Sequence, residues 1–321
     1  MVFYKTVTCG NDFLHIDAEE LGTAAESLTA AGLPPVPRGH REKIDRGELA
    51  RRLCHRLTGP GADGVVFYKI PPHSSEVDFE IFNRDGSEAE LSGNGMAGCS
   101  AVLLYLNKLD DRDQVTLNTK AGIKRHSCLR REKNKFRLNV EIGPADFRDR
   151  DFFPFIDETP VSTPGDDSKD LPKAPVLRAY RYEDIAFYPV SVGNPHAVVL
   201  LEEALPLEQL EQMGKKLENA PLFPQKANVE LVFPAGPSPL HPGEDSDEKG
   251  GNIRVFYYER GVGITQSSST GSAAVYAVLQ ALNLITDSLA IPFPQGEIKI
   301  SGKNKIYIES YTEIVYKGIF F

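Results

Sequence analysis

The sequence lacks the features that mark several classes of protein. None of its 321 residues belong to a run approaching the roughly 20 apolar residues that a membrane-spanning helix needs. Basic residues are not in excess, because 36 Lys and Arg stand against 45 Asp and Glu, a net charge of −9. We therefore expect no nucleic-acid partner, which would need a basic field, and no binding to an anionic membrane surface.

Cysteines are few and isolated. Cys9, Cys54, Cys99 and Cys128 form no Cys-x-x-Cys pair and have no neighbouring histidine at metal-ligand spacing. We expect reduced thiols, no structural metal and a cytoplasmic protein. The opening residues show no apolar segment behind a basic head, so we expect no secretory signal.

The remaining composition is that of an ordinary globular protein, with 41% hydrophobic and 25% charged residues and length for two domains. Alternating residues predict strands at 3–7 and 13–16. Apolar residues at spacings of three and four, or in short runs, predict helices at 46–57, 98–107, 206–219 and 272–283. A loop with a short helix is predicted at 18–43, an extended crossing between halves at 143–175, and a surface loop at 234–251 with a solvated acidic stretch at 244–248.

One pattern occurs twice. A strand ending in an acidic and glycine-containing turn is followed by small polar residues and an apolar helix, first around Ser92 and again around Ser268. The two serines lie about half a chain length apart. The pattern indicates two related halves whose helix N-termini face one cleft, where free backbone N–H groups favour an anion such as a carboxylate. Chance similarity between two strand–turn–helix units is the alternative.

Short motifs keep a fixed order along the chain. They include Gly-Asn-Asp-Phe at 10–13, Gly-Ala-Asp-Gly at 61–64 and Gly-Asn-Pro-His-Ala-Val at 193–198. Further matching segments are residues 16–17, 82–90, 93–95, 119–122, 223–224, 228–229, 259–265 and 270–271. In this order the sequence resembles the diaminopimelate epimerase family.

The resemblance implies an α+β fold of two pseudo-symmetric halves, each a curved, mostly antiparallel sheet or barrel around a central helix. We expect residues 1–136 with 306–321 to form one half and residues 137–305 the other, with the active site in the cleft between them. The family is cofactor-independent and acts on a small amino acid, converting LL- to meso-diaminopimelate on the route to lysine and peptidoglycan. The resemblance also implies a homodimer.

The family inverts the α-carbon with two cysteines, one on each face of the substrate. Ser92 and Ser268 occupy these two positions here. A thiol has a pKa of about 8.5, and a hydroxyl as weakly acidic as water has a far higher one. The difference is about 7 pKa units, or about 10 kcal/mol of less accessible base, so two-thiol chemistry is not expected of this chain.

Other residues of the family's site are present. By resemblance, His196 and Glu259 lie beside the reacting centre. The expected substrate contacts are Asn11, Asn83, Gly93, Asn94, Asn194, Asn228, Arg260, Ser269 and Thr270. Asparagine amides donate and accept hydrogen bonds without adding charge, which suits a zwitterion. No metal ligand is expected.

The sequence is compatible with three functions. The first is amino-acid epimerisation as in the family. The second is a one-base isomerase in which His196 or Glu259 moves the proton, with Ser92 or Ser268 as hydrogen-bond donor. The third is an amino-acid-binding homologue without activity. The serines are either natural or an engineered replacement of both cysteines.

Overall fold

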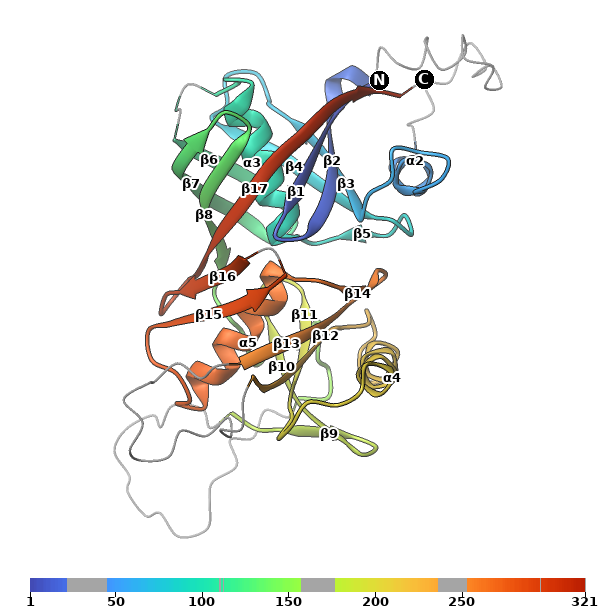
Figure 1. The fold of residues 1–321 in the computed structure, drawn as a ribbon, viewed down its shortest axis with the longest axis vertical. Helices are drawn as coiled ribbons and strands as arrows, with labels where there is room; N and C mark the ends of the chain where they lie inside the picture. Colours follow the sequence, from blue (N-terminus) through green and yellow to red (C-terminus); the bar gives the residue numbers. More distant parts are fainter. Residues whose placement is uncertain are drawn as a thin grey trace.

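The computed structural model describes residues 1–21, 45–109, 111, 113–156, 177–235, 253–294 and 296–320. The predicted loops at 18–43, 143–175 and 234–251 lie mostly outside these ranges, and the acidic stretch at 244–248 lies wholly outside them. Figure 1 shows two halves stacked along the long axis of the molecule, with both chain termini at the far end of the first half.

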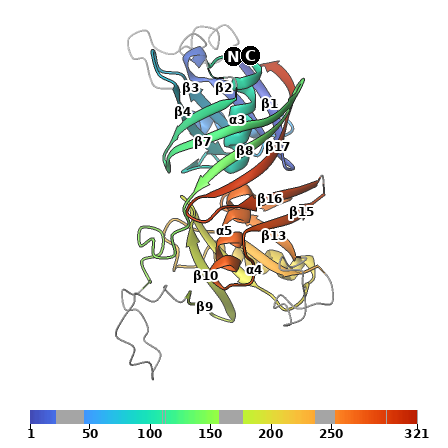
Figure 2. The ribbon, with the colours of Figure 1, turned by 90° about the vertical axis from the view of Figure 1, so that its left-hand side faces the viewer.

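A closed barrel of eight strands forms the first half. Its strands are β1 (Val2–Thr8), β2 (Asn11–Asp17), β3 (Gly64–Lys69), β4 (Glu76–Asn83), β6 (Gln114–Thr119), β7 (Gly122–Glu132), β8 (Lys135–Gly143) and β17 (Ile306–Ile319). The barrel closes because β1 pairs with both β2 and β17. Neighbouring strands are antiparallel except β2 with β3 and β4 with β6. Inside lies α3 (Gly93–Tyr105), buried at every residue but Tyr105 (Figure 2).

The second half also has its strands arranged around a central helix. A six-stranded sheet contains β9 (Tyr180–Tyr182), β10 (Ile185–Ser191), β11 (Pro195–Leu200), β12 (Asn228–Pro234), β13 (Ile253–Glu259) and β14 (Gly263–Thr265), and β15 (Ser288–Phe293) pairs with β16 (Gly296–Ser301) beside it. The central helix is α5 (Ser269–Ala281), buried over residues 269–279. The parallel pair β11 and β12 is joined through α4 (Leu207–Glu218), as β2 and β3 are joined through α2 (Arg46–Cys54). The predicted α+β fold of two pseudo-symmetric halves is confirmed.

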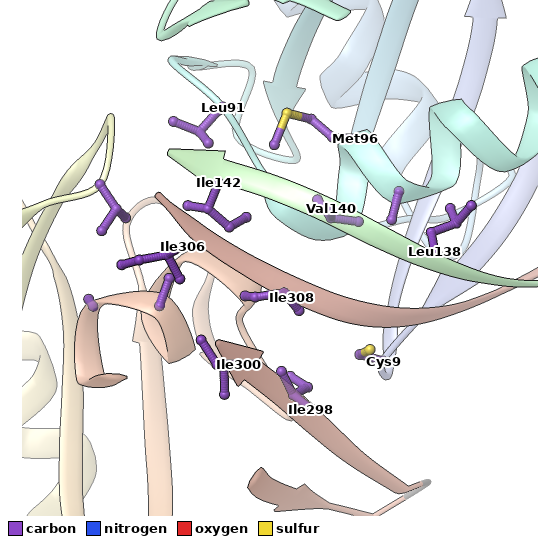
Figure 3. Close-up of a cluster of buried hydrophobic side chains, with 14 of the residues drawn as sticks. Cys9, Leu91, Met96, Leu138, Val140, Ile142, Ile298, Ile300, Ile306 and Ile308 are labelled. Carbon is purple, nitrogen blue, oxygen red and sulfur yellow. The ribbon is translucent and has the colours of Figure 1, made fainter. Parts of the chain in front are cut away.

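The two halves share strands and core at their junction. β17 pairs with β8 and β1 in the first barrel, and its opening residues pair with β16, which belongs to the second half. Ile298 and Ile300 of β16 lie beside Ile306 and Ile308 of β17, and Ile142 of β8 lies across from them in the same hydrophobic core (Figure 3). The predicted boundary at 136/137 falls inside β8, so this strand continues unbroken across it.

The predicted helix over 46–57 is wrong at its C-terminal end. α2 ends at Cys54, and the N–H groups of Gly61 and Ala62 bond to the carbonyls of Leu53 and Cys54. The returning chain thus takes the acceptors that another helical turn would use. Leu57, which the spacing placed on the apolar face, is 91% exposed. No helix in the described ranges is long and apolar enough to cross a membrane.

Candidate active site

Ser92 and Ser268 occupy equivalent positions at the starts of the two central helices. Each is the N-cap residue with extended backbone, at φ −144° and ψ 121° for Ser92 and φ −140° and ψ 123° for Ser268. Each side-chain oxygen accepts a hydrogen bond of 3.2 Å from the N–H three residues later, on Gly95 or Gly271. Serine is a preferred N-cap for this reason, and capping starts both helices earlier than the apolar runs had predicted.

The two helix N-termini meet across the boundary between the halves. A Cβ atom added to Gly93 would lie 2.3 Å from Cβ of Ser269, closer than two carbon atoms can approach. The Ser269 hydroxyl donates to Oδ1 of Asn94. The positive ends of α3 and α5 therefore converge on one place, where an anion is favoured.

A pocket opens between the halves beside these helix N-termini. It is lined by Asn11, Phe13, Asp63, Asn83, Ala89, Leu91, Ser92, Asn194, Asn228, Glu259, Arg260, Val262 and Thr270. Eight of these are residues predicted for the site. The other predicted residues, Gly93, Asn94, Ser268, Ser269 and His196, do not line it: the first four lie in the helix N-termini beside it, and His196 is fully buried behind it.

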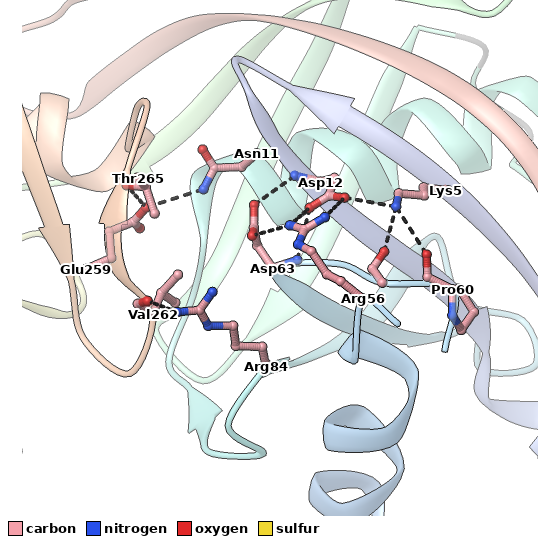
Figure 4. Close-up of polar contacts among 11 residues, drawn as sticks. Lys5, Asn11, Asp12, Arg56, Pro60, Asp63, Arg84, Glu259, Val262 and Thr265 are labelled. Carbon is pink, nitrogen blue, oxygen red and sulfur yellow. Dashed lines mark hydrogen bonds and ion pairs between the residues drawn. The ribbon is translucent and has the colours of Figure 1, made fainter. Parts of the chain in front are cut away.

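Glu259 is the titratable group at the centre of the site. Oε1 accepts hydrogen bonds from Thr265 Oγ1 at 2.6 Å and from Asn11 Nδ2 at 3.3 Å (Figure 4). Oε2 accepts one from Ser268 Oγ at 3.1 Å. Burial raises the pKa of Glu259 to about 7, although these three donors lower it. A carboxyl group with such a pKa changes its charge near neutral pH and suits general acid–base work.

The opposite serine has no such partner. Ser92 Oγ accepts from the Gly95 N–H, and among the described residues no acidic or basic side chain hydrogen-bonds to it. The two serines are therefore equivalent in backbone geometry and different in chemistry. Among the described residues, an acid–base side chain hydrogen-bonds to Ser268 and none does so to Ser92.

Asp63 is a pocket residue that sequence reasoning missed as a site residue, although it lies in the Gly-Ala-Asp-Gly motif that carried part of the resemblance. Arg56 bridges Asp63 and Asp12 at 2.7 and 2.8 Å, and Lys5 contacts Asp12 at 2.9 Å (Figure 4). Burial, followed by the charge of Asp12, raises the pKa of Asp63. This network anchors the loop before β3 at the edge of the pocket.

Arginines tie the two halves together around the pocket. Arg84, in the turn after β4, donates to the carbonyl of Val262 in the turn after β13 (Figure 4). In the reverse direction, Arg260 of the second half pairs with Glu90 of the first. The Arg260 N–H also donates to Oδ1 of Asn228 at 3.0 Å.

His196 is part of a buried chain of side chains. Its Nδ1 lies 2.9 Å from Glu230 Oε1, and its Nε2 lies 2.9 Å from Asn194 Oδ1. The side chains of His196 and Glu230 are fully buried. With both ring nitrogens engaged, His196 reaches the pocket through Asn194.

Solved racemases and epimerases share this two-half fold. A probable proline racemase from Agrobacterium radiobacter superposes with a TM-score of 0.61 at 15% identity, over 100% of this chain and 92% of that one. A hydroxyproline epimerase from Agrobacterium vitis gives a TM-score of 0.59 at 14% identity, over 100% and 91%. A phenazine biosynthesis protein of the PhzF family from Bacillus anthracis gives 0.59 at 15%, over 100% and 99%.

Sequence comparison is more specific. The family model for diaminopimelate epimerase matches residues 3–148 and 188–316. The diaminopimelate epimerase of Carboxydothermus hydrogenoformans is 31% identical over 324 residues, covering 100% of both chains. That of Methanothermobacter thermautotrophicus is 29% identical over 324 residues, covering 99% of this chain and 98% of the relative. The chain belongs to the diaminopimelate epimerase family, and these relatives support the prediction of a cofactor-independent amino-acid epimerase.

Proposed function

We propose that this protein is an isomerase of its family that binds a free amino acid between its halves and moves the α-proton with Glu259. The observation that carries the proposal is the hydrogen-bonded Glu259 carboxyl, whose pKa of about 7 lets it accept and return a proton at neutral pH. His196 is the weaker choice of base, because it does not line the pocket and both its nitrogens are engaged.

The polar groups around the pocket suit an amino acid with a second charged end. The converging N-termini of α3 and α5 offer backbone N–H groups to the α-carboxylate. Arg260 and the four pocket asparagines offer donors and acceptors to the remaining polar groups of the ligand. The named activity of the relatives makes diaminopimelate the proposed substrate.

Proton movement on one face is the reaction that these groups support. Glu259 removes the α-proton and returns a proton to the same carbon, while Ser268 orients the carboxyl through its 3.1 Å hydrogen bond. Inversion needs a second acid on the opposite face, and Ser92 there has only its capping bond. We propose that exchange of the α-proton with solvent is faster than inversion.

The second candidate function is amino-acid binding without catalysis. It is favoured by serine at both positions where the resemblance implies cysteine. A protein of this kind would bind the amino acid and turn nothing over. Ligand-dependent thermal stabilisation reports binding in either case, so the two candidates differ only in proton exchange. The cytoplasmic location and the homodimer stay predictions from the sequence.

Proton exchange in D₂O tests the proposal. LL- and meso-diaminopimelate are incubated with the protein, and loss of the α-C–H signal is followed by NMR beside Glu259→Gln and the matched surface variant Glu211→Gln. We expect loss of signal that Glu259→Gln abolishes and Glu211→Gln leaves unchanged. Thermal stabilisation by diaminopimelate without exchange would establish the binding protein instead. If diaminopimelate causes no stabilisation and no exchange, it is not the ligand.

A further inference from the structure

We propose that Glu230 is a positioning residue that acts through His196 to hold the Asn194 side chain with its NH₂ group toward the pocket. Asn194 would then donate to a carboxylate of the ligand and would not accept from an ammonium group. The inference rests on the proposed function in one respect, namely that the ligand of this pocket is an amino acid.

Three side chains form the chain of contacts. Glu230 lies on β12 and His196 on the parallel neighbour β11, with 2.9 Å between Glu230 Oε1 and His196 Nδ1. On the other side of the ring, His196 Nε2 lies 2.9 Å from Oδ1 of Asn194, a residue that lines the pocket. Glu230 and His196 are fully buried, so water does not compete for these contacts.

The N-terminal turn of α5 lies directly against the Glu230 carboxyl group. A Cβ atom on Gly271 would come within 2.5 Å of Glu230 Oε1, so the approach depends on glycine at this position. Unpaired N–H groups and the helix dipole make this end of a helix favourable for negative charge. The location therefore stabilises negative charge on the Glu230 carboxyl group, whose Oε2 has no protein partner among the described residues.

The number of protons on the Glu230–His196 pair decides the direction of each hydrogen bond. A buried carboxylate is costly unless an opposite charge pairs with it, and His196 is its hydrogen-bonded partner. A pair of Glu230 carboxylate and His196 imidazolium has N–H on both ring nitrogens. A neutral pair, with the proton on Glu230, still has N–H on Nε2. In both forms Nε2 donates to Asn194 Oδ1, and the amide nitrogen of Asn194 is left to face the ligand.

One other arrangement would reverse this recognition. If the pair held a single proton, on Nδ1, then Nε2 would accept from the Asn194 amide and Oδ1 would face the pocket. That arrangement has no counter-charge on His196, so the N-terminus of α5 alone would stabilise the negative charge of Glu230. By holding a proton on His196, Glu230 thus determines whether Asn194 presents its NH₂ group to a carboxylate or its Oδ1 to an ammonium group of the ligand.

The protonation of His196 can be measured directly. In ¹⁵N-labelled protein at pH 7, long-range ¹H–¹⁵N correlation of the histidine rings, with His196 assigned by its loss in His196→Gln, reports each ring nitrogen. We expect a protonated Nε2. An unprotonated Nε2 overturns the inference whether or not the protein acts on an amino acid, so this readout is independent of the proposed function.

Ligand preference provides the functional test. The probes are 2-aminopimelate, which carries a second carboxylate, and lysine, which carries a second ammonium group. We expect the wild-type protein to prefer 2-aminopimelate and Glu230→Gln to reduce that preference about tenfold, the value of one hydrogen bond to a charged group. Asn194→Asp, which presents only acceptors, should shift the preference further toward lysine.

A purely structural role gives a different result. It would lower the stability of Glu230→Gln and weaken both probes by the same factor, which would overturn the inference. If the wild-type protein binds neither probe nor meso-diaminopimelate, the proposed function is contradicted. The measured protonation of His196 Nε2 would still decide the direction of the hydrogen bonds.

Discussion

Ser268 Oγ lies 3.1 Å from Glu259 Oε2, whereas Ser92, in the same backbone conformation on the opposite helix, has no acidic or basic partner among the described residues. A site built from two repeated halves is thus symmetric in its backbone and asymmetric in its acid–base chemistry. Helix capping needs only a small polar side chain and is met by both serines. Proton transfer needs a titratable group, and among the described residues one hydrogen-bonds to Ser268 and none to Ser92.

Glu259 makes stability depend on pH. The unfolded chain releases this proton near its ordinary pKa of 4.5, whereas the folded protein keeps it to about pH 7. The folded state therefore binds more protons between these values, so stability falls as pH rises through this window and the loss is complete above it. The full shift corresponds to a loss of about 3 kcal/mol in the free energy of unfolding. We expect a loss of about 1–2 kcal/mol, because the side chain is only half-buried and solvent screens its charge.

Glu259→Gln cannot ionise and should remove this loss. We expect the variant to gain stability relative to wild type at pH 8 and to show no gain at pH 4.5, as measured by urea unfolding at both values. Glu211→Gln, on the exposed face of α4, serves as control and should change neither. An equal effect of Glu259→Gln at both pH values would contradict an altered pKa.

Restoring both thiols should restore inversion. The Ser92→Cys/Ser268→Cys variant places a group with a pKa of about 8.5 on each face, where the hydroxyls have a pKa far above neutral. We expect the rate of interconversion of LL- and meso-diaminopimelate, measured by chiral chromatography, to rise at least about 100-fold over the wild-type protein. Either single variant should increase exchange and leave inversion slow. A double variant that folds and binds but does not invert would show that the pocket no longer holds the α-carbon between the two positions.

Much of this architecture could be predicted because it depends on local sequence. The apolar runs behind Ser92 and Ser268 predict the two central helices, and the repeated order of motifs predicts two halves. The capping role of the two serines, which starts both helices earlier, was not predicted. Glu230 could not be found in this way. Its position beside His196 follows from the parallel pairing of β12 with β11, between which the chain makes α4. The prediction that the helix extends to Leu57 failed for a related reason, because hydrogen bonds from the returning loop end α2 at Cys54.

Opening between the halves should depend on Arg84. Its guanidinium donates to the Val262 carbonyl across the pocket, and its removal leaves the Arg260–Glu90 pair as the remaining arginine contact of this kind in the described site. Because Arg84 is exposed, Arg84→Ala should cost less than about 0.5 kcal/mol of global stability. We expect amide hydrogen exchange in β14 to accelerate about 3- to 10-fold, as for a local opening. Arg125→Ala, an exposed arginine on β7, should leave it unchanged.

The contact of Gly93 with Ser269 should be essential to the closed arrangement of the helices. In Gly93→Ala the new methyl group would lie 2.3 Å from Ser269 Cβ, so the N-termini of α3 and α5 must separate. We expect a loss of about 1–3 kcal/mol in urea unfolding, typical of overpacking, even though alanine favours a helix more than glycine does. Ser269→Gly removes the opposing Cβ, so Gly93→Ala/Ser269→Gly should recover most of this loss, a coupling that a double-mutant cycle measures. Additive effects of the two substitutions would show that the helix ends are not in contact in solution, and the anion site between them would then have to form only when a ligand binds.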